Sequence, residues 1–123
     1  MATVYYFVAD LSLNDAHWNW EPVLARSKAL FGSPHRLPVA LLVSLAEADE
    51  LYAACIAEAA QIDRKEAARE FEHLQSADLL IPVSREIKPR SRGRPAQFME
   101  RQDDHAWSAL QALGERFRKP GAK

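Results

Sequence analysis

The sequence predicts a mainly helical fold with one small β-hairpin, in the α+β class, and three observations lead to it. Apolar residues recur at helical spacing through most of the chain, and turn-forming residues separate the runs. Two short segments, 79–87 and 96–102, are rich in strand-forming residues instead. The 123 residues, of which 48% are hydrophobic and 27% charged, suffice for one globular domain with its own core.

Charge is unevenly distributed along the chain, although the formal net charge is only −1. Residues 84–101 hold six basic side chains and two acidic ones, so this span is +4 and the remainder is −5. A net charge near zero argues against a protein that coats nucleic acid or an anionic membrane through bulk charge. The positive charge is instead concentrated in one segment.

Cysteine content and hydropathy predict a cytoplasmic protein that does not associate with membranes. The single cysteine, Cys55, cannot form an internal disulfide, and its alanine-rich surroundings predict a buried helical residue rather than a redox sensor. No apolar run approaches the ~20 residues that span a bilayer. The N-terminal segment lacks the basic start and the small-residue cleavage site of a signal peptide.

Residues 1–33 predict an arm followed by a helix. Residues 3–9 are β-branched and aromatic, which suits a short strand or an arm buried against a partner. A helix then begins after Asn19 as its cap and ends where Gly32 and Pro34 stop the apolar pattern. A second helix is predicted over 33–48, with Ser33 as its cap and four leucines that indicate a well-buried element.

The next stretch, 49–80, divides at residues 61–63 into a helix of about ten residues and a second helix over 63–77. Asp63 and Glu66 have the spacing of a capping box, which marks the start of that second helix. Its spacing predicts two faces. The inner face holds Ala67, Phe71 and Leu74, and the outer face holds Arg64, Lys65, Ala68, Arg69 and Glu72. Two helices joined by a turn of three or four residues can place the second helix in a DNA major groove.

Residues 88–95, with the sequence KPRSRGRP, lie between the two predicted strands, and strand, basic loop and strand together make a wing. Residues 34–104 therefore resemble the winged helix-turn-helix repressors of the ArsR, MarR and PadR type of bacteria and archaea. The segment IAEAAQIDRKEAAREFEHL, from Ile56 to Leu74, is similar to their motif without a gap. The resemblance implies a transcriptional regulator, most often a repressor, that binds double-stranded DNA as a homodimer.

Two positions depart from the pattern of these repressors. Gln61 stands where the family usually has glycine, so the turn must reach its backbone angles without that freedom. Glu70 and Glu72 make the predicted recognition helix more acidic than is usual for a DNA reader. These carboxylates face neighbouring helices, read cytosine amino groups or indicate a helix that meets protein. The last possibility defines an alternative function, a protein-interaction module of winged-helix type.

The RSRGRP stretch of the predicted wing is close to the core of an AT-hook. In that motif Arg-Gly-Arg lies extended in a narrow A·T minor groove, because glycine lets the backbone approach the groove floor. The alternative is a solvated loop whose charges keep the protein soluble. The residues predicted to contact DNA are Arg64, Lys65, Ala68 and Arg69 of the helix and Lys88, Arg90, Arg92, Gly93 and Arg94 of the wing.

The segment from about Asp103 to Lys119 predicts an amphipathic helix, with acidic residues near its start and basic ones near its end. Residues 105–123 are the predicted C-terminal unit, this helix and a short tail. A winged core has limited surface for this apolar stripe and for the one on the first helix, so we expect a homodimer through both. The alternative is that both stripes fold back on their own core. The predicted dimer residues are Trp20, Leu24, Phe31, Trp107, Leu110, Leu113 and Phe117.

Signs of catalysis or of a cofactor are few. Asp103 and His105 resemble the first half of the metal site on the last helix of some ArsR sensors, but Arg116 and Lys119 occupy the second half. No nucleophile, phosphate-loop or paired-carboxylate pattern is present in the sequence. We predict no enzyme, no metal and no cofactor. An effector ligand is a third alternative, in a pocket formed by Trp18, Trp20 and Trp107 between the terminal helices.

Overall fold

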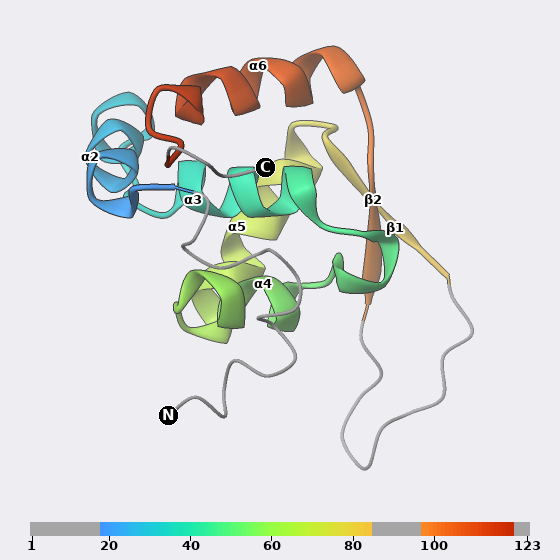
Figure 1. The fold of residues 1–123 in the computed structure, drawn as a ribbon. Coiled ribbons are helices and arrows are strands. Elements are labelled where there is room, and N and C mark those ends of the chain that lie inside the picture. The colour runs from blue at the N-terminus through green and yellow to red at the C-terminus, as the bar shows by residue number, and fades with distance from the viewer. Residues whose placement is uncertain (1–17, 85–96, 120–123) are drawn as a thin grey trace.

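The computed structural model describes residues 18–84 and 97–119, which form a mainly helical fold with one two-stranded antiparallel sheet (Figure 1). The α+β class is therefore confirmed. The elements are α2 (Trp20–Phe31), α3 (Arg36–Leu45), the 3-10 turn η2 (Ala48–Glu50), α4 (Ala53–Ala60), α5 (Arg64–Ser76), β1 (Leu80–Val83), β2 (Phe98–Arg101) and α6 (Asp104–Glu115). The predicted arm at 3–9 and the predicted wing at 88–95 lie outside the described residues.

The helix α3 lies at the centre of the fold because it is apolar on every side. All seven residues from Leu37 to Val43 are buried, which is typical of a helix that is hydrophobic all round. In Figure 1, α6 lies above α3, α4 lies below it and α2 lies beside it, and all three contact α3. This arrangement makes α3 the base on which the other helices are positioned.

The first two helices differ in how well the sequence predicted their ends. The end of α2 is as predicted, because Gly32 takes the left-handed conformation, with φ of 77°. The start of α3 is not, because the helix begins at Arg36 and its N-cap is His35. The predicted cap, Ser33, contacts other groups: its Oγ accepts from the His35 amide at 3.3 Å and donates to a carboxylate of α5.

The capping box of the structure is not the predicted one. It lies at Glu47 and Glu50, where the Glu47 amide donates to Glu50 Oε1 at 2.9 Å, and it begins the short η2 turn. At the start of α5, Asp63 is the N-cap, but its side chain makes no capping hydrogen bond. The prediction was wrong because the Glu66 side chain is engaged elsewhere, with a residue that precedes α3.

The two strands pair antiparallel, as predicted, with Leu80 opposite Arg101 and Val83 opposite Phe98. The sheet is attached to the helices at two points. The Met99 amide donates to the Leu51 carbonyl at 3.0 Å. The Arg101 guanidinium donates to two carbonyls at the C-terminal end of α3, those of Val43 at 2.7 Å and of Ala46 at 2.9 Å, and so joins the strand to this end of the helix.

The last helix, α6, packs on α3, and the residues that follow it contact the N-terminal end of the described chain. Asp103 caps it by accepting from the Ala106 amide at 3.2 Å. Gly114 allows a close approach, because a Cβ there would lie 2.6 Å from a methyl carbon of Leu41. Beyond the helix, the Asn19 amide donates to the Phe117 carbonyl at 2.9 Å.

Cys55 is buried on α4, as the sequence predicted. Burial raises the pKa of its thiol to about 12, and the nearby carboxylates of Glu50, Glu58 and Asp49 add to the effect. The thiol is therefore protonated at neutral pH and is a poor nucleophile. Within 18–84 and 97–119, none of the helices is both long enough and apolar enough to cross a membrane.

Candidate nucleic-acid interface

A three-residue turn, 61–63, joins α4 to α5 and sets the direction of α5. Gln61 is in the left-handed region, with φ of 59°, and so takes the conformation for which a glycine was expected. The Ile62 amide donates to the Ala57 carbonyl at 3.0 Å and closes the turn. The absence of glycine at this position therefore leaves the left-handed ending of α4 intact, at a steric cost of about 1 kcal/mol.

The two predicted faces of α5 are confirmed. Ala67, Phe71 and Leu74 are buried, and Phe71 and Leu74 pack into the cluster formed around α3. The outer face is exposed to solvent and brings together the four predicted contact residues of this helix, Arg64, Lys65, Ala68 and Arg69. The helix is thus anchored through one side and presents the other.

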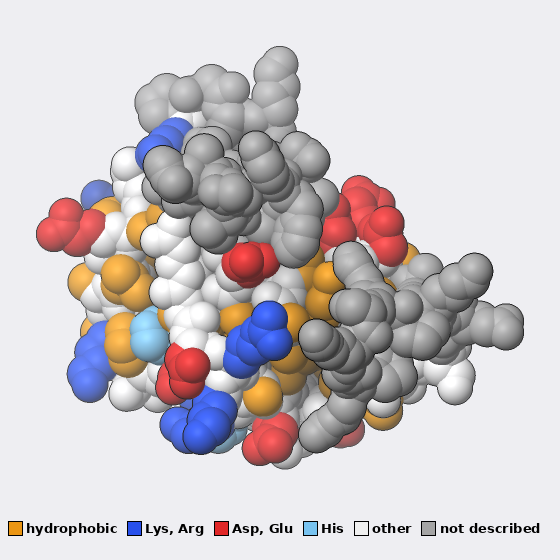
Figure 2. Space-filling view, turned by 90° about the horizontal axis from the view of Figure 1, so that it is seen from below, with side chains coloured by type: hydrophobic (Ala, Val, Ile, Leu, Met, Phe, Trp, Pro, Cys, Tyr) orange, Lys and Arg blue, Asp and Glu red, His pale blue; other side chains and the backbone are white. Residues whose placement is uncertain are grey.

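Charge on the described part of this outer face is mixed. Glu72 and the cap residue Asp63 are exposed beside the three basic residues of α5. The side of the molecule on which α4 lies shows the same mixture, with Lys and Arg side chains interspersed among Asp and Glu (Figure 2). The described surface therefore lacks the uniform positive field that binds phosphates without further help.

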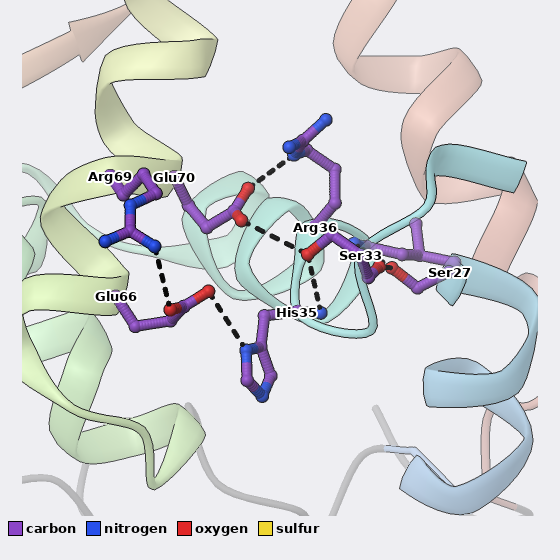
Figure 3. A network of polar contacts seen from close by, with 8 residues as sticks. Ser27, Ser33, His35, Arg36, Glu66, Arg69 and Glu70 are labelled. Atoms are coloured by element: carbon purple, nitrogen blue, oxygen red, sulfur yellow. Dashed lines mark hydrogen bonds and ion pairs between the residues drawn. The ribbon is translucent and has the colours of Figure 1, made fainter.

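Glu70, one of the two unexplained acidic residues of α5, belongs to the interior. Glu70 is 2% exposed, and both of its carboxylate oxygens have partners (Figure 3). Arg36 Nε donates to Oε1, and Ser33 Oγ donates to Oε2 at 3.3 Å. Of the three explanations open from the sequence, contact with a neighbouring helix holds for Glu70.

A polar path continues from this carboxylate to α2. The Ser27 hydroxyl, which is completely buried, donates to the Ser33 carbonyl at 2.6 Å and accepts from the Leu37 amide at 2.8 Å. Ser33 in turn reaches Glu70. Hydrogen bonds therefore join the segment between α2 and α3 to α5, and a polar network with buried members such as Ser27 and Glu70 favours a single arrangement of the helices.

Glu66 lies at the border between the two faces of α5. Its Oε2 lies 3.3 Å from Nδ1 of His35, and its Oε1 lies 3.6 Å from a terminal nitrogen of Arg69 (Figure 3). One carboxylate thus connects the segment before α3 to an arginine of the outer face.

Sequence reasoning missed the roles of Ser33, His35, Arg36 and Glu70. One signal was present, because position 70 lies three residues after Ala67 and four before Leu74, inside the buried stripe. The partners themselves are 34 to 37 positions away in the chain, and no local pattern identifies them.

The five wing residues predicted to contact DNA, Lys88, Arg90, Arg92, Gly93 and Arg94, lie outside the described residues. The two strands that border the predicted wing are described, and Val83 pairs with Phe98 at that end of the sheet. The chain therefore leaves and re-enters the described fold at neighbouring positions.

Most of the predicted dimer residues pack on the chain's own core. Trp107 is 4% exposed and donates from Nε1 to the Leu79 carbonyl at 3.1 Å, so it has little surface left for a second copy. The others are half-buried, and Trp20, Phe31, Leu110, Leu113 and Phe117 pack against the two apolar clusters. A larger apolar exposure lies at Leu30 of α2, which is 55% exposed. The homodimer stays a prediction.

The pocket expected from three tryptophans forms with two of them. Trp18 and Trp20 lie with ring centroids 5.4 Å apart and border an open pocket of about 430 Å³ with Asn19, Glu21, Pro22 and Lys119. Trp107 does not line this pocket, because it packs in the other cluster, against the sheet and α3. That part of the ligand-pocket prediction was wrong.

No group of three or more histidine, cysteine, aspartate or glutamate side chains that could hold a metal ion occurs among residues 18–84 and 97–119. Asp103 caps α6, and His105 is exposed on its first turn.

Comparison of the chain with protein-family models, with curated proteins and with solved structures finds no match.

Proposed function

We propose that this chain is a sequence-specific regulator of transcription that binds double-stranded DNA through a winged helix-turn-helix domain at 34–104. In this proposal α5 enters the major groove and the Arg-rich segment 88–95 reaches the adjacent minor groove. The resemblance to bacterial and archaeal repressors supports a repressor and a homodimer, with the operator read by two copies of α5.

The observation that carries the proposal is the exposed outer face of α5. Four residues on it, Arg64, Lys65, Ala68 and Arg69, have no part in the core, whereas the opposite face is buried against α4 and α3. Arginine and lysine donate to guanine and to phosphates, and a small alanine lets a helix approach the base edges and contact a thymine methyl group. A helix anchored in this way can approach a groove without losing packing.

The mixed charge of the described surface makes the segment between the strands necessary to the proposal. Residues 85–96 hold five basic side chains and one acidic one. The strands on either side of this segment, β1 and β2, pair antiparallel. In the proposal, the basic side chains between them supply the phosphate contacts that α5 alone provides too sparsely.

The burial of Glu70 weakens the alternative of a protein-interaction module. That alternative rested on an acidic recognition helix, and Glu70 was half of its support. With Glu70 buried and paired to Arg36, the exposed acidic residue of the pair is Glu72 alone. The outer face of α5 then carries more basic side chains than acidic ones.

Binding of duplexes by two charge-matched variants tests the proposal. Replacing Arg92 and Arg94 with alanine should weaken binding at least ~10-fold at moderate salt and reduce the salt slope by one to two units, since each lost contact removes about one unit. The control removes two exposed charges elsewhere, Lys28 of α2 and Arg116 after α6, and should leave the slope unchanged. Wild-type binding with no salt dependence would overturn the proposal. Equal losses of affinity in both variants would mean that the chain binds DNA through its total charge and not through a defined interface.

A further inference from the structure

Arg69 is the basic residue of the outer face of α5 whose side chain has an ion pair among the described residues. Its side chain is 62% exposed, and a terminal nitrogen lies 3.6 Å from Glu66 Oε1, one turn earlier on the same helix. The Glu66 side chain is 27% exposed and so lies at the edge of the buried face. The Arg69 guanidinium is therefore accessible to another molecule, and its orientation is restrained by Glu66.

Glu66 is itself held from the other side. Its second oxygen lies 3.3 Å from His35, the residue before α3. His35 is in turn fixed, because its amide donates to Ser33 Oγ, which belongs to the network around buried Glu70. A chain of contacts thus runs from the core, through His35 and Glu66, to the exposed Arg69.

We infer that Glu66 is a positioning residue that orients Arg69 to read a base edge, an inference that rests on the proposed function. A guanidinium presents its donors as a rigid planar fork, so an ion pair at one terminal nitrogen favours orientations in which the remaining donors point outward. Bidentate recognition of guanine O6 and N7 needs such a fixed fork. An arginine held in advance also loses less rotamer freedom on binding.

The charge of Glu66 has a second effect, which makes the inference testable. It partly neutralises Arg69, so Arg69 contributes little to the salt-dependent attraction that DNA of any sequence exerts. Glu66→Gln removes the charge and keeps the shape of the side chain, and it should therefore have opposite effects on two kinds of binding. The affinity for non-specific duplex should rise, whereas the preference for the selected sequence should fall.

The test uses the duplex that the wild-type chain selects from a random pool and a scrambled duplex of the same length and composition. Glu66→Gln is compared with Glu21→Gln, which makes the same change of charge on an exposed residue of α2, away from the outer face of α5. Glu66→Gln should lower the ratio of the two affinities roughly 5- to 10-fold. Glu21→Gln should change binding to both duplexes alike and leave the ratio unchanged.

An Arg69→Ala background separates positioning from a general structural effect. If Glu66 acts through Arg69, the Glu66→Gln change should no longer lower the ratio in that background, and should behave like Glu21→Gln. His35 gives a further check, because His35→Ala should lower the ratio as well, whereas His35→Gln, which keeps a polar group that can bond to Glu66, should restore part of it. Melting temperatures confirm that the variants are folded.

The outcomes distinguish this inference from the proposed function. If the wild-type chain prefers a sequence, but Glu66→Gln and Glu21→Gln change the ratio equally, the positioning role is overturned and the proposed function stands. A loss of preference in Glu66→Gln that persists without Arg69 also overturns it. If the wild-type chain binds no duplex, both the proposed function and this role are overturned.

Discussion

On the buried face of α5, the side chain of Glu70 is 3% exposed, and both of its oxygens have partners outside α5. On the opposite face, Arg64 and Lys65 are exposed, and neither forms an ion pair with another described residue. The same helix thus contains a charge that the fold requires and charges that it does not.

The difference teaches how to assign a charged helix. A buried carboxylate without partners would cost several kcal/mol, so a buried and paired Glu70 identifies the side of α5 that stabilises the fold. Exposed side chains such as Arg64 and Lys65 contribute little to stability, so the fold itself does not account for their charge. The count of acidic residues on the helix is therefore a poor guide to the charge of its outer face.

The largest expected effect tests the apolar part of the inner face. Phe71→Ala should lower the free energy of unfolding by about 3–5 kcal/mol, because it leaves a cavity in the cluster shared with α3. Urea denaturation measures the change, with Ala68→Ser on the outer face as a control that should stay within about 0.5 kcal/mol. Similar losses in both variants would mean that the two faces of α5 do not differ as described.

The next effect tests the polar part of the inner face. Glu70→Ala removes the acceptor of Arg36 and Ser33 and should lower the free energy of unfolding by about 2–3 kcal/mol, since buried partners are left unpaired. Glu72→Ala, two residues along on the outer face, should cost less than about 0.5 kcal/mol.

A double-mutant cycle apportions that loss. Because Glu70 and Arg36 contact each other, the combined Glu70→Ala and Arg36→Ala variant should be more stable than the sum of the two single losses predicts, by about 1 kcal/mol or more. Strict additivity, or a Glu70→Ala variant as stable as Glu72→Ala, would show that the buried pair does not form in solution.

Local periodicity was enough to predict the two faces of α5 and most of the element order. Ala67, Phe71 and Leu74 are separated by helical spacing, and such spacing is fixed by the geometry of one helix alone. For the same reason the strands around residues 80–83 and 98–101 and the end of α2 at Gly32 were predicted from short stretches. These features need no knowledge of what each element packs against.

Features that depend on distant partners were missed or misassigned. Glu70 is in the buried stripe, but its burial is tolerated only because Arg36 lies opposite, 34 positions earlier. Trp107 was expected at a dimer interface, but its indole meets the Leu79 carbonyl, 28 positions away. Spacing predicts that a side chain faces inward, and it does not predict whether the partner belongs to the same chain.

The start of α5 shows the same competition at a single residue. The spacing of Asp63 and Glu66 is that of a capping box, a local arrangement worth about 1 kcal/mol. In the structure Glu66 contacts His35 and Arg69 instead, and Asp63 makes no capping bond through its side chain. A tertiary contact has therefore replaced the local one that the sequence favours.

The smallest expected effect follows from that replacement. Asp63→Ala should lower the free energy of unfolding by only about 0.5 kcal/mol or less, because the change removes a favourable charge at the helix start but no hydrogen bond. Asp103→Ala is the contrast: its side chain does cap α6 and its φ is 68°, so the loss there should be about 1–2 kcal/mol. Urea denaturation of the two variants side by side measures both.

If Asp63→Ala lowered the free energy of unfolding by more than about 1 kcal/mol, two features of the structure would be contradicted: the missing side-chain cap and the contacts of Glu66. It would mean that the Asp63 side chain does bond to the first turn of α5 in solution, as in the capping box that the sequence predicts. In that box Glu66 reaches back to the Asp63 amide, which draws its carboxylate away from His35 and Arg69. Arg69 would then be unrestrained, and the outer face of α5 would present three independent cations rather than two and an oriented guanidinium. The stability of Asp63→Ala therefore tests whether Glu66 contacts His35 and Arg69 in solution.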